Sequence, residues 1–158
     1  MEFFIKDFIN FLKIYNFNET ILDKKYHFTK SGVNNTFTID ILKNNEINIK
    51  HKRNNCNEEE IKTYKVDEGI KFIINRIDQN INGVLIKKDF FIQELLKNAF
   101  IEKRISDDEV IYVKDKIMIK HFITKDIFTF LDSEINLTQY NLQKIIELSV
   151  TMEIDFKL

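Results

Sequence analysis

The segment Asp89–Phe122 constrains the fold most, because its spacing of apolar residues changes from helical to strand-like with no break between them. Its first part predicts an amphipathic helix over Asp89–Lys103, with Asp89 as the N-terminal cap. The helical stripe is carried by apolar residues at four-residue spacing: Phe91, Leu95 and Ala99. The next residues alternate like two strands, so a turn at Lys114-Asp115 predicts a hairpin whose apolar face packs on the helix.

The second face of this hairpin has a mixed character. In the expected register, Ile111 lies opposite Met118 and Glu109 lies opposite Lys120, and Val113 shares this face. Because apolar side chains and an opposite-charge pair stand together there, we expect this face to contact another protein. Ile111, Met118 and Val113 are therefore candidate protein-binding residues.

The N-terminal half begins with a predicted helix, Glu2–Tyr15, that is apolar around much of its circumference. We expect it to be buried between a sheet and a second helix, and an alternative is that it also touches another subunit through Phe3 and Phe11. Alternating residues then predict an antiparallel meander over Tyr26–Thr29, Phe37–Ile41 and Ile47–Lys50. Ile61–Val66 is an expected edge strand, and Asp67 is expected to cap a second helix.

The C-terminal half continues with an expected strand at Ile127–Leu131 and a helix at Thr138–Leu148. For residues 148–158 the pattern fits a continued helix and a terminal strand equally well. The whole chain predicts an α+β fold of antiparallel sheets packed by amphipathic helices. The order is one helix, three or four strands, two helices, two or three strands and a last helix. The chain is either one domain, 1–158, or two sub-halves, 1–80 and 84–158, joined by a hinge at Asn80–Gly83.

A short similarity links the two halves. Each begins with an acidic residue followed by Phe-Phe-Ile, at Glu2–Ile5 and at Asp89–Ile92. Each then continues through antiparallel strands to a closing helix. The two halves are therefore candidates for a pseudo-repeat.

Composition excludes several classes of function. The net charge of −1 argues against non-specific nucleic-acid binding, which needs a basic surface. No apolar run approaches the roughly 20 residues of a membrane span, so no membrane contact is expected. A single cysteine, Cys56, forms no internal disulfide, and Lys6 and Asp7 interrupt the apolar N-terminus in a way that does not fit a signal peptide. We therefore expect a cytoplasmic protein.

The sequence contains no motif for catalysis, a cofactor or a metal. One cysteine and three histidines are too few for a structural zinc site, so we expect no metal, no cofactor and no catalytic residue. An enzyme that uses scattered carboxylates or a Cys56–His51 pair stays a third alternative. The basic residues Lys50, Lys52 and Arg53, close to Glu58–Glu60, are expected to be solvated, or to orient a protein partner.

The order of elements resembles that of the class I type III secretion chaperones and the related YbjN-like proteins. The likeness is strongest over Leu95–Glu153, and it is carried by these residues: Leu96, Asn98, Asp107-Asp108-Glu109, Leu137, Leu142, Ile145-Ile146, Thr151 and Glu153. The resemblance implies a small α+β protein without catalytic residues that dimerises through its central helix and hairpin. It also implies that apolar grooves on the sheet hold an extended client segment. This chain differs in an extra strand and helix at Ile61–Gln79, and it is less acidic than these chaperones usually are.

These observations predict a non-enzymatic, chaperone- or adaptor-like protein that binds another protein and forms a homodimer. The alternative is a small inhibitor or immunity protein, encoded by a phage or another mobile element, that blocks an enzyme or nuclease by direct binding.

Overall fold

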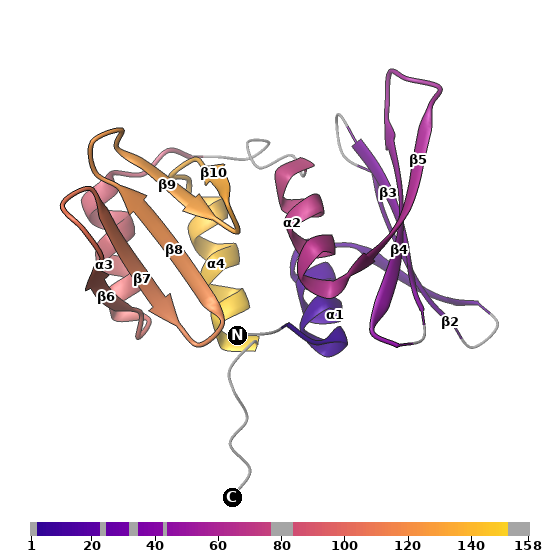
Figure 1. Ribbon diagram of the computed structural model, residues 1–158, viewed down its shortest axis with the longest axis horizontal. Coiled ribbons are helices and arrows are strands. Elements are labelled where there is room, and N and C mark those ends of the chain that lie inside the picture. Colours follow the sequence, from indigo (N-terminus) through magenta and orange to yellow (C-terminus); the bar gives the residue numbers. More distant parts are fainter. Residues whose placement is uncertain (1–2, 23–24, 32–34, 43, 77–83, 152–158) are drawn as a thin grey trace, which may run out of the picture. The chain divides into compact units, whose positions relative to one another are not determined.

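The computed structural model describes residues 3–22, 25–31, 35–42, 44–76 and 84–151. The chain divides into two compact units, Glu2–Asp78 and Gln79–Leu158. Within the described residues, each unit contains a five-stranded antiparallel sheet and two helices (Figure 1). The predicted α+β class and order of elements are confirmed. None of the described helices is long and apolar enough to cross a membrane.

In the N-terminal unit, one helix precedes and one helix follows five strands along the chain. The strands form a meander, in which each strand pairs with the next one. Its elements are α1 Ile5–Ile14, β1 Asn18–Leu22, β2 Lys25–Ser31, β3 Asn35–Ile41, β4 Glu46–Arg53, β5 Glu59–Lys65 and α2 Val66–Arg76. The expected edge strand is β5, which ends the sheet. The sequence pattern did not predict β1, which follows α1 after Asn16 takes a positive φ of 63°.

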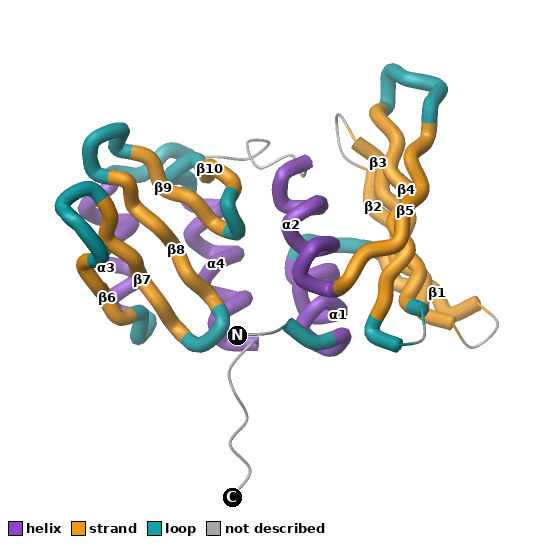
Figure 2. Tube along the Cα trace, in the orientation of Figure 1, coloured by secondary structure: helices purple, strands orange, loops and turns teal. Residues whose placement is uncertain are grey.

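Alternation along the strands builds the core of this unit. Phe28, Ile39 and Ile49 are neighbours across β2, β3 and β4, and all three are buried. Figure 2 shows α1 and α2 on one side of this sheet. Helix α2 approaches the sheet closely at Gly69, where an added Cβ would lie 2.1 Å from Ile47 Cδ1. A glycine at this position therefore lets the helix pack directly on β4.

The C-terminal unit repeats the same order of helix, five strands and helix. Its elements are α3 Lys88–Lys97, β6 Ile101–Arg104, β7 Glu109–Lys114, β8 Ile117–Phe122, β9 Ile127–Phe130, β10 Ser133–Ile135 and α4 Gln139–Thr151. The sheet order is β10-β9-β8-β7-β6, again a meander. The two described units thus share one architecture, as expected for a pseudo-repeat, although β6 and β10 were not predicted.

The predicted helix Asp89–Lys103 is too long. Helix α3 ends at Lys97, and Ala99 then takes a positive φ of 69° that reverses the chain. The next residues form β6 and pair with β7, with Ile101 opposite Val113. Pairing within the sheet therefore overrides the helical spacing, and no glycine or proline marks the end of the helix.

The expected hairpin register is shifted by two residues. The turn residues are Asp115 and Lys116, with Asp115 at a φ of 50°, so Val113 lies opposite Met118. Ile111 lies opposite Lys120 and not opposite Met118. Because side chains alternate with a period of two, this shift leaves every residue on the face that was predicted for it.

The two predicted helix caps are also wrong in position. Lys87 is the N-cap residue of α3, and Asp89 lies in the first turn. Helix α2 begins at Val66, so Asp67 is inside the helix, where its Oδ1 accepts a hydrogen bond of 3.1 Å from the backbone N–H of Phe3.

The ambiguous C-terminal segment is helical as far as Thr151, the last residue of α4. The rest of that segment, residues 152–158, and the expected hinge at Asn80–Gly83 lie outside the described residues.

Candidate protein-binding face of the C-terminal sheet

Helices α3 and α4 lie on one side of the C-terminal sheet, behind its strands in Figure 1. The side chains on the other side, which we call the open face, are set by alternation along the strands. The strand register arranges them in three rows: Ile101, Val113 and Met118; Lys103, Ile111, Lys120, Thr129 and Glu134; Glu109, Phe122 and Ile127. The open face therefore carries apolar and charged side chains next to one another.

The first of these rows, which we call the apolar row, crosses β6, β7 and β8. Ile101 is 61% exposed and Met118 is 41% exposed, and Val113 between them is half-buried. Ile111 in the next row is only 7% exposed. It lies between Lys103 and Lys120 on the neighbouring strands, and a lysine can cover an apolar neighbour with its aliphatic stem while its charge stays in water.

The matching face of the N-terminal sheet has a different character. Its rows are Thr29, Thr38, Lys50 and Ile61; His27, Asp40, Asn48 and Thr63; Thr36, Lys52 and Glu59. Apart from Ile61, these residues are polar or charged. The same architecture is thus built with a polar open face in one unit and a partly apolar open face in the other. An exposed apolar row is therefore not a requirement of this fold.

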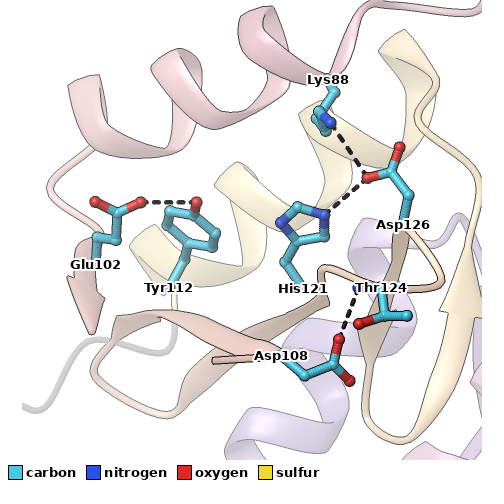
Figure 3. Close-up of polar contacts among 7 residues, drawn as sticks. All are labelled: Lys88, Glu102, Asp108, Tyr112, His121, Thr124 and Asp126. Carbon is cyan, nitrogen blue, oxygen red and sulfur yellow. Dashed lines mark hydrogen bonds and ion pairs between the residues drawn. The ribbon is translucent and has the colours of Figure 1, made fainter. Parts of the chain in front are cut away.

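Beneath the open face, the central strands are fixed by buried aromatic residues on the helix side. The Tyr112 hydroxyl donates a hydrogen bond of 2.9 Å to Glu102 Oε1 of the neighbouring strand (Figure 3). Burial, followed by this hydrogen bond to Glu102, raises the pKa of Tyr112 above its ordinary value, so the phenol stays neutral. This contact ties β6 to β7.

A second polar cluster holds the turn between β8 and β9. The ring of His121 stacks on Phe128 at 4.1 Å between ring centroids, and its Nε2 lies 2.9 Å from Asp126 Oδ1. Lys88 Nζ at the start of α3 lies 3.3 Å from the same oxygen (Figure 3). The hydrogen bond with His121, and then that with Lys88, lower the pKa of Asp126. The cluster anchors the turn to α3, and we assign it a structural role.

Asp108 of the acidic turn before β7 is also structural. Its backbone carbonyl accepts a hydrogen bond of 2.7 Å from Ile123 N–H, and its Oδ1 accepts one of 2.6 Å from Thr124 N–H (Figure 3). A hydrogen bond with the Thr124 side chain, and then the one from the Thr124 backbone N–H, lower the pKa of Asp108. The loop before β7 is thereby attached to the turn after β8.

The two N-terminal candidates, Phe3 and Phe11, are buried. Phe11 has no exposed surface, and its ring packs against Tyr15 at 4.8 Å and Phe8 at 6.2 Å between centroids. Phe3 is 9% exposed. These side chains are core residues, so the expectation that they form a contact surface is not carried further.

The three basic candidates do not form one patch. Lys50 and Lys52 lie on the open face of the N-terminal sheet, while alternation along β4 directs Arg53 to the other face. Lys50 Nζ forms an ion pair of 3.1 Å with Glu59 on β5. They also belong to a different unit from Ile111, Val113 and Met118. The structure therefore separates the predicted site residues into two groups.

His51 and Cys56 have different environments. His51 is buried, with its Nε2 2.7 Å from Asn35 Oδ1 and its ring stacked on Phe37 at 5.1 Å. Burial, and then the charge of Arg76, lower the pKa of His51. Cys56 is exposed. Among the residues that the structure describes, no group of three His, Cys, Asp or Glu side chains is placed to hold a metal ion.

The N-terminal unit also has a shallow hollow of about 380 Å³ where β5 meets α2. Phe3, Phe4, Glu46, Lys65 and Asp67 are among the residues that line it. Its charged groups have mixed signs and its Asp67 carboxylate is already bonded to Phe3 N–H. The hollow therefore offers less of a binding surface than the apolar row.

Comparison of the chain with protein-family models, with curated proteins and with solved structures finds no match. The residues of the open face are therefore the feature of the molecule that points to a function. Of these, Ile101 was missed by sequence reasoning, because it falls inside the range Asp89–Lys103 that was predicted as a helix.

Proposed function

We propose that this chain is a non-enzymatic, protein-binding protein whose contact surface is the open face of the C-terminal sheet. One observation carries the proposal: Ile101, Val113 and Met118 form a continuous apolar row across three strands. Exposing such side chains is unfavourable in water and promotes association. The largely polar face of the N-terminal sheet supports the proposal, since the same architecture there carries Ile61 alone among the residues of its three rows and no apolar row.

The charges around the apolar row indicate the chemistry of the partner. Lys103 and Lys120 lie in the adjacent row, while the two acidic residues are further from the apolar row, Glu109 along β7 and Glu134 on β10. A partner segment that buries the apolar row and places acidic side chains over the two lysines complements this surface. An extended, apolar and acidic segment, as a chaperone or adaptor holds, fits this description.

The experiment compares Met118→Asp with a matched control, Ile61→Asp. Ile61 is 61% exposed on the open face of the other sheet, so both changes place a carboxylate on an exposed strand position. The full chain and both variants are used to capture proteins from host extracts, and the enriched proteins are quantified by mass spectrometry. Each candidate partner is then purified and its affinity is measured by titration calorimetry.

We expect at least one partner that binds the wild type and Ile61→Asp equally and binds Met118→Asp at least about tenfold more weakly, because a carboxylate would be desolvated in an apolar contact. If every partner binds Met118→Asp as tightly as the wild type, the open face is not the contact surface.

The alternative function, a single-target inhibitor or immunity protein, is favoured by a separate observation. The open face of the N-terminal sheet is a polar surface bearing Lys50 and Lys52, and such surfaces suit charge-guided binding to one target. The same capture experiment with Lys52→Glu discriminates the two functions. A partner that is lost with Lys52→Glu and retained with Met118→Asp supports the inhibitor and contradicts our main proposal.

A further inference from the structure

Strand β6 ends the C-terminal sheet in the part of the chain that the structure describes. The Ile105 N–H donates to the Glu109 carbonyl at 2.9 Å, which continues the pairing of β6 with β7. Hydrogen bonds alternate along an antiparallel pair, so residues 101, 103 and 105 bond to β7. The backbone groups of Glu102 and Arg104 are then directed to the free edge, where a further strand can bond to them.

We propose that a second copy of this chain adds to this edge, with the two β6 strands antiparallel about a twofold axis at Lys103. Such an axis runs perpendicular to the sheet and keeps the helices of both copies on one side. Directly opposed residues of two antiparallel strands point to the same side of the sheet. The twofold axis must therefore pass through a residue and not between two residues, so each possible register is defined by its central residue. With Lys103 at the centre, Glu102 lies opposite Arg104 of the second copy, and Arg104 lies opposite Glu102.

Charge complementarity selects this register. It creates two Glu102–Arg104 pairs, and both residues are exposed although they point to the helix side, so the helices do not cover them. A register centred on Glu102 would oppose two carboxylates, and one centred on Arg104 would oppose two guanidinium groups. Like charges directly opposite each other destabilise a strand pair.

The same register pairs apolar residues on the open face. Ile101, 61% exposed, lies opposite Ile105 of the second copy, and Ile105 is itself 56% exposed. The symmetry produces this pair twice. Both residues are among the most exposed apolar side chains of the unit, and pairing withdraws them from water. One contact in this register is unfavourable: the charge of Lys103 lies opposite that of Lys103 in the second copy.

This inference depends on β6 and not on the proposed partner binding, although the two are connected in space. Across the paired edges, the apolar row of one copy continues into Ile105 of the other, and Glu109 then separates Ile105 from Phe122. The open faces of two copies would then form one surface. The dimer in this proposal uses the sheet edge, which differs from the helix-and-hairpin interface implied by the resemblance to secretion chaperones.

The test is a charge swap followed by sedimentation equilibrium and light scattering of the full chain, from about 1 µM to about 1 mM, a range in which small interfaces dissociate. We expect the mass of the wild type to rise with concentration from 19.0 kDa to twice that value. Glu102→Arg and Arg104→Glu should each raise the dissociation constant about tenfold, because two attractive pairs become repulsive. The double variant E102R/R104E should return to within about threefold of the wild type, since the pairs are restored with reversed polarity.

Two further variants control for effects inside the subunit. Glu102→Arg also removes the acceptor of the Tyr112 hydroxyl, so Tyr112→Phe should leave the dissociation constant unchanged. Lys103→Thr removes the like-charge contact at the centre and should lower the dissociation constant at least about threefold.

A wild type that stays at 19.0 kDa throughout the range overturns the proposal. The proposal is also overturned if neither single charge reversal raises the dissociation constant of the dimer. It is equally overturned if the double variant has a dissociation constant as high as those of the single variants. Met118 lies outside the strand that pairs in the dimer, so the two proposals can fail separately. If the wild type is a monomer but still binds a partner through Met118, this inference is refuted and the proposed function stands.

Discussion

Replacing Ile111 with alanine should cost the C-terminal unit much more stability than replacing Met118 with alanine. Both residues lie on the open face, but Ile111 is 7% exposed and Met118 is 41% exposed. Burial of a whole Ile or Met side chain is worth about 1.5–3 kcal/mol, and truncation of a packed side chain adds a cavity cost. Scaling by the buried fraction gives about 1.4–2.8 kcal/mol for Ile111→Ala and about 0.9–1.8 kcal/mol for Met118→Ala, and the cavity cost, which applies to the packed Ile111, raises its loss to about 3 kcal/mol or more.

Hydrogen exchange with mass-spectrometric readout is the suitable assay, because it resolves the two units and needs no tryptophan, which the chain lacks. The free energy of opening is read from the backbone amides of β7 and β8. Ile61→Ala on the open face of the other sheet is the control and should leave these amides unchanged. If Met118→Ala costs as much as Ile111→Ala, then Met118 is part of a packed interior, and the open face is not a free surface.

Two other predictions concern the N-terminal unit. Gly69→Ala should lower the free energy of unfolding by about 1–3 kcal/mol, because the new Cβ meets the buried Ile47 Cδ1. In urea unfolding, the double variant Gly69→Ala/Ile47→Val should recover part of that loss. If the free-energy losses of the two substitutions simply add, Gly69→Ala does not act through contact with Ile47. The lowered pKa of His51 means that the folded state favours the neutral imidazole, so its contribution is complete above pH of about 6.5 and is lost as the pH falls below that value. Between pH of about 7.5 and 5.5, the wild type should lose more stability than His51→Gln, and equal losses would rule out His51 as the cause.

The strands that the sequence predicted best are those with strict alternation. Phe37–Ile41 and Ile47–Lys50 alternate between apolar and polar residues, and they became β3 and β4. Strand β6 was missed because the helical stripe Phe91, Leu95 and Ala99 continues past the end of α3 and the chain reversal uses Ala99, a residue that rarely takes a positive φ. With three glycines and no proline, this sequence marks few of its turns in the usual way.

The candidate site was partly predictable for a geometric reason. A two-residue error in hairpin register preserves the face of every side chain, so Ile111, Val113 and Met118 were placed on one face correctly. Their exposure was not predictable, since it depends on which neighbours lie beside them. Ile111 has a lysine opposite it on each neighbouring strand, whereas Met118 lies near the turn end of β8, where pairing with β9 begins only at Ile119.

The placement of lysines beside the apolar row makes the open face selective. An exposed apolar strand edge invites aggregation, and charged side chains next to it discourage pairing with arbitrary chains. Lys103 occupies the centre of the β6 edge, so any added strand must offset its charge or tolerate it. In the proposed dimer, a second copy would offset it with two Glu102–Arg104 pairs, and the proposed acidic partner on the open face would neutralise it directly. Partner binding should therefore strengthen the dimer, since it removes the repulsion between the two central lysines, and Lys103→Thr should abolish that coupling.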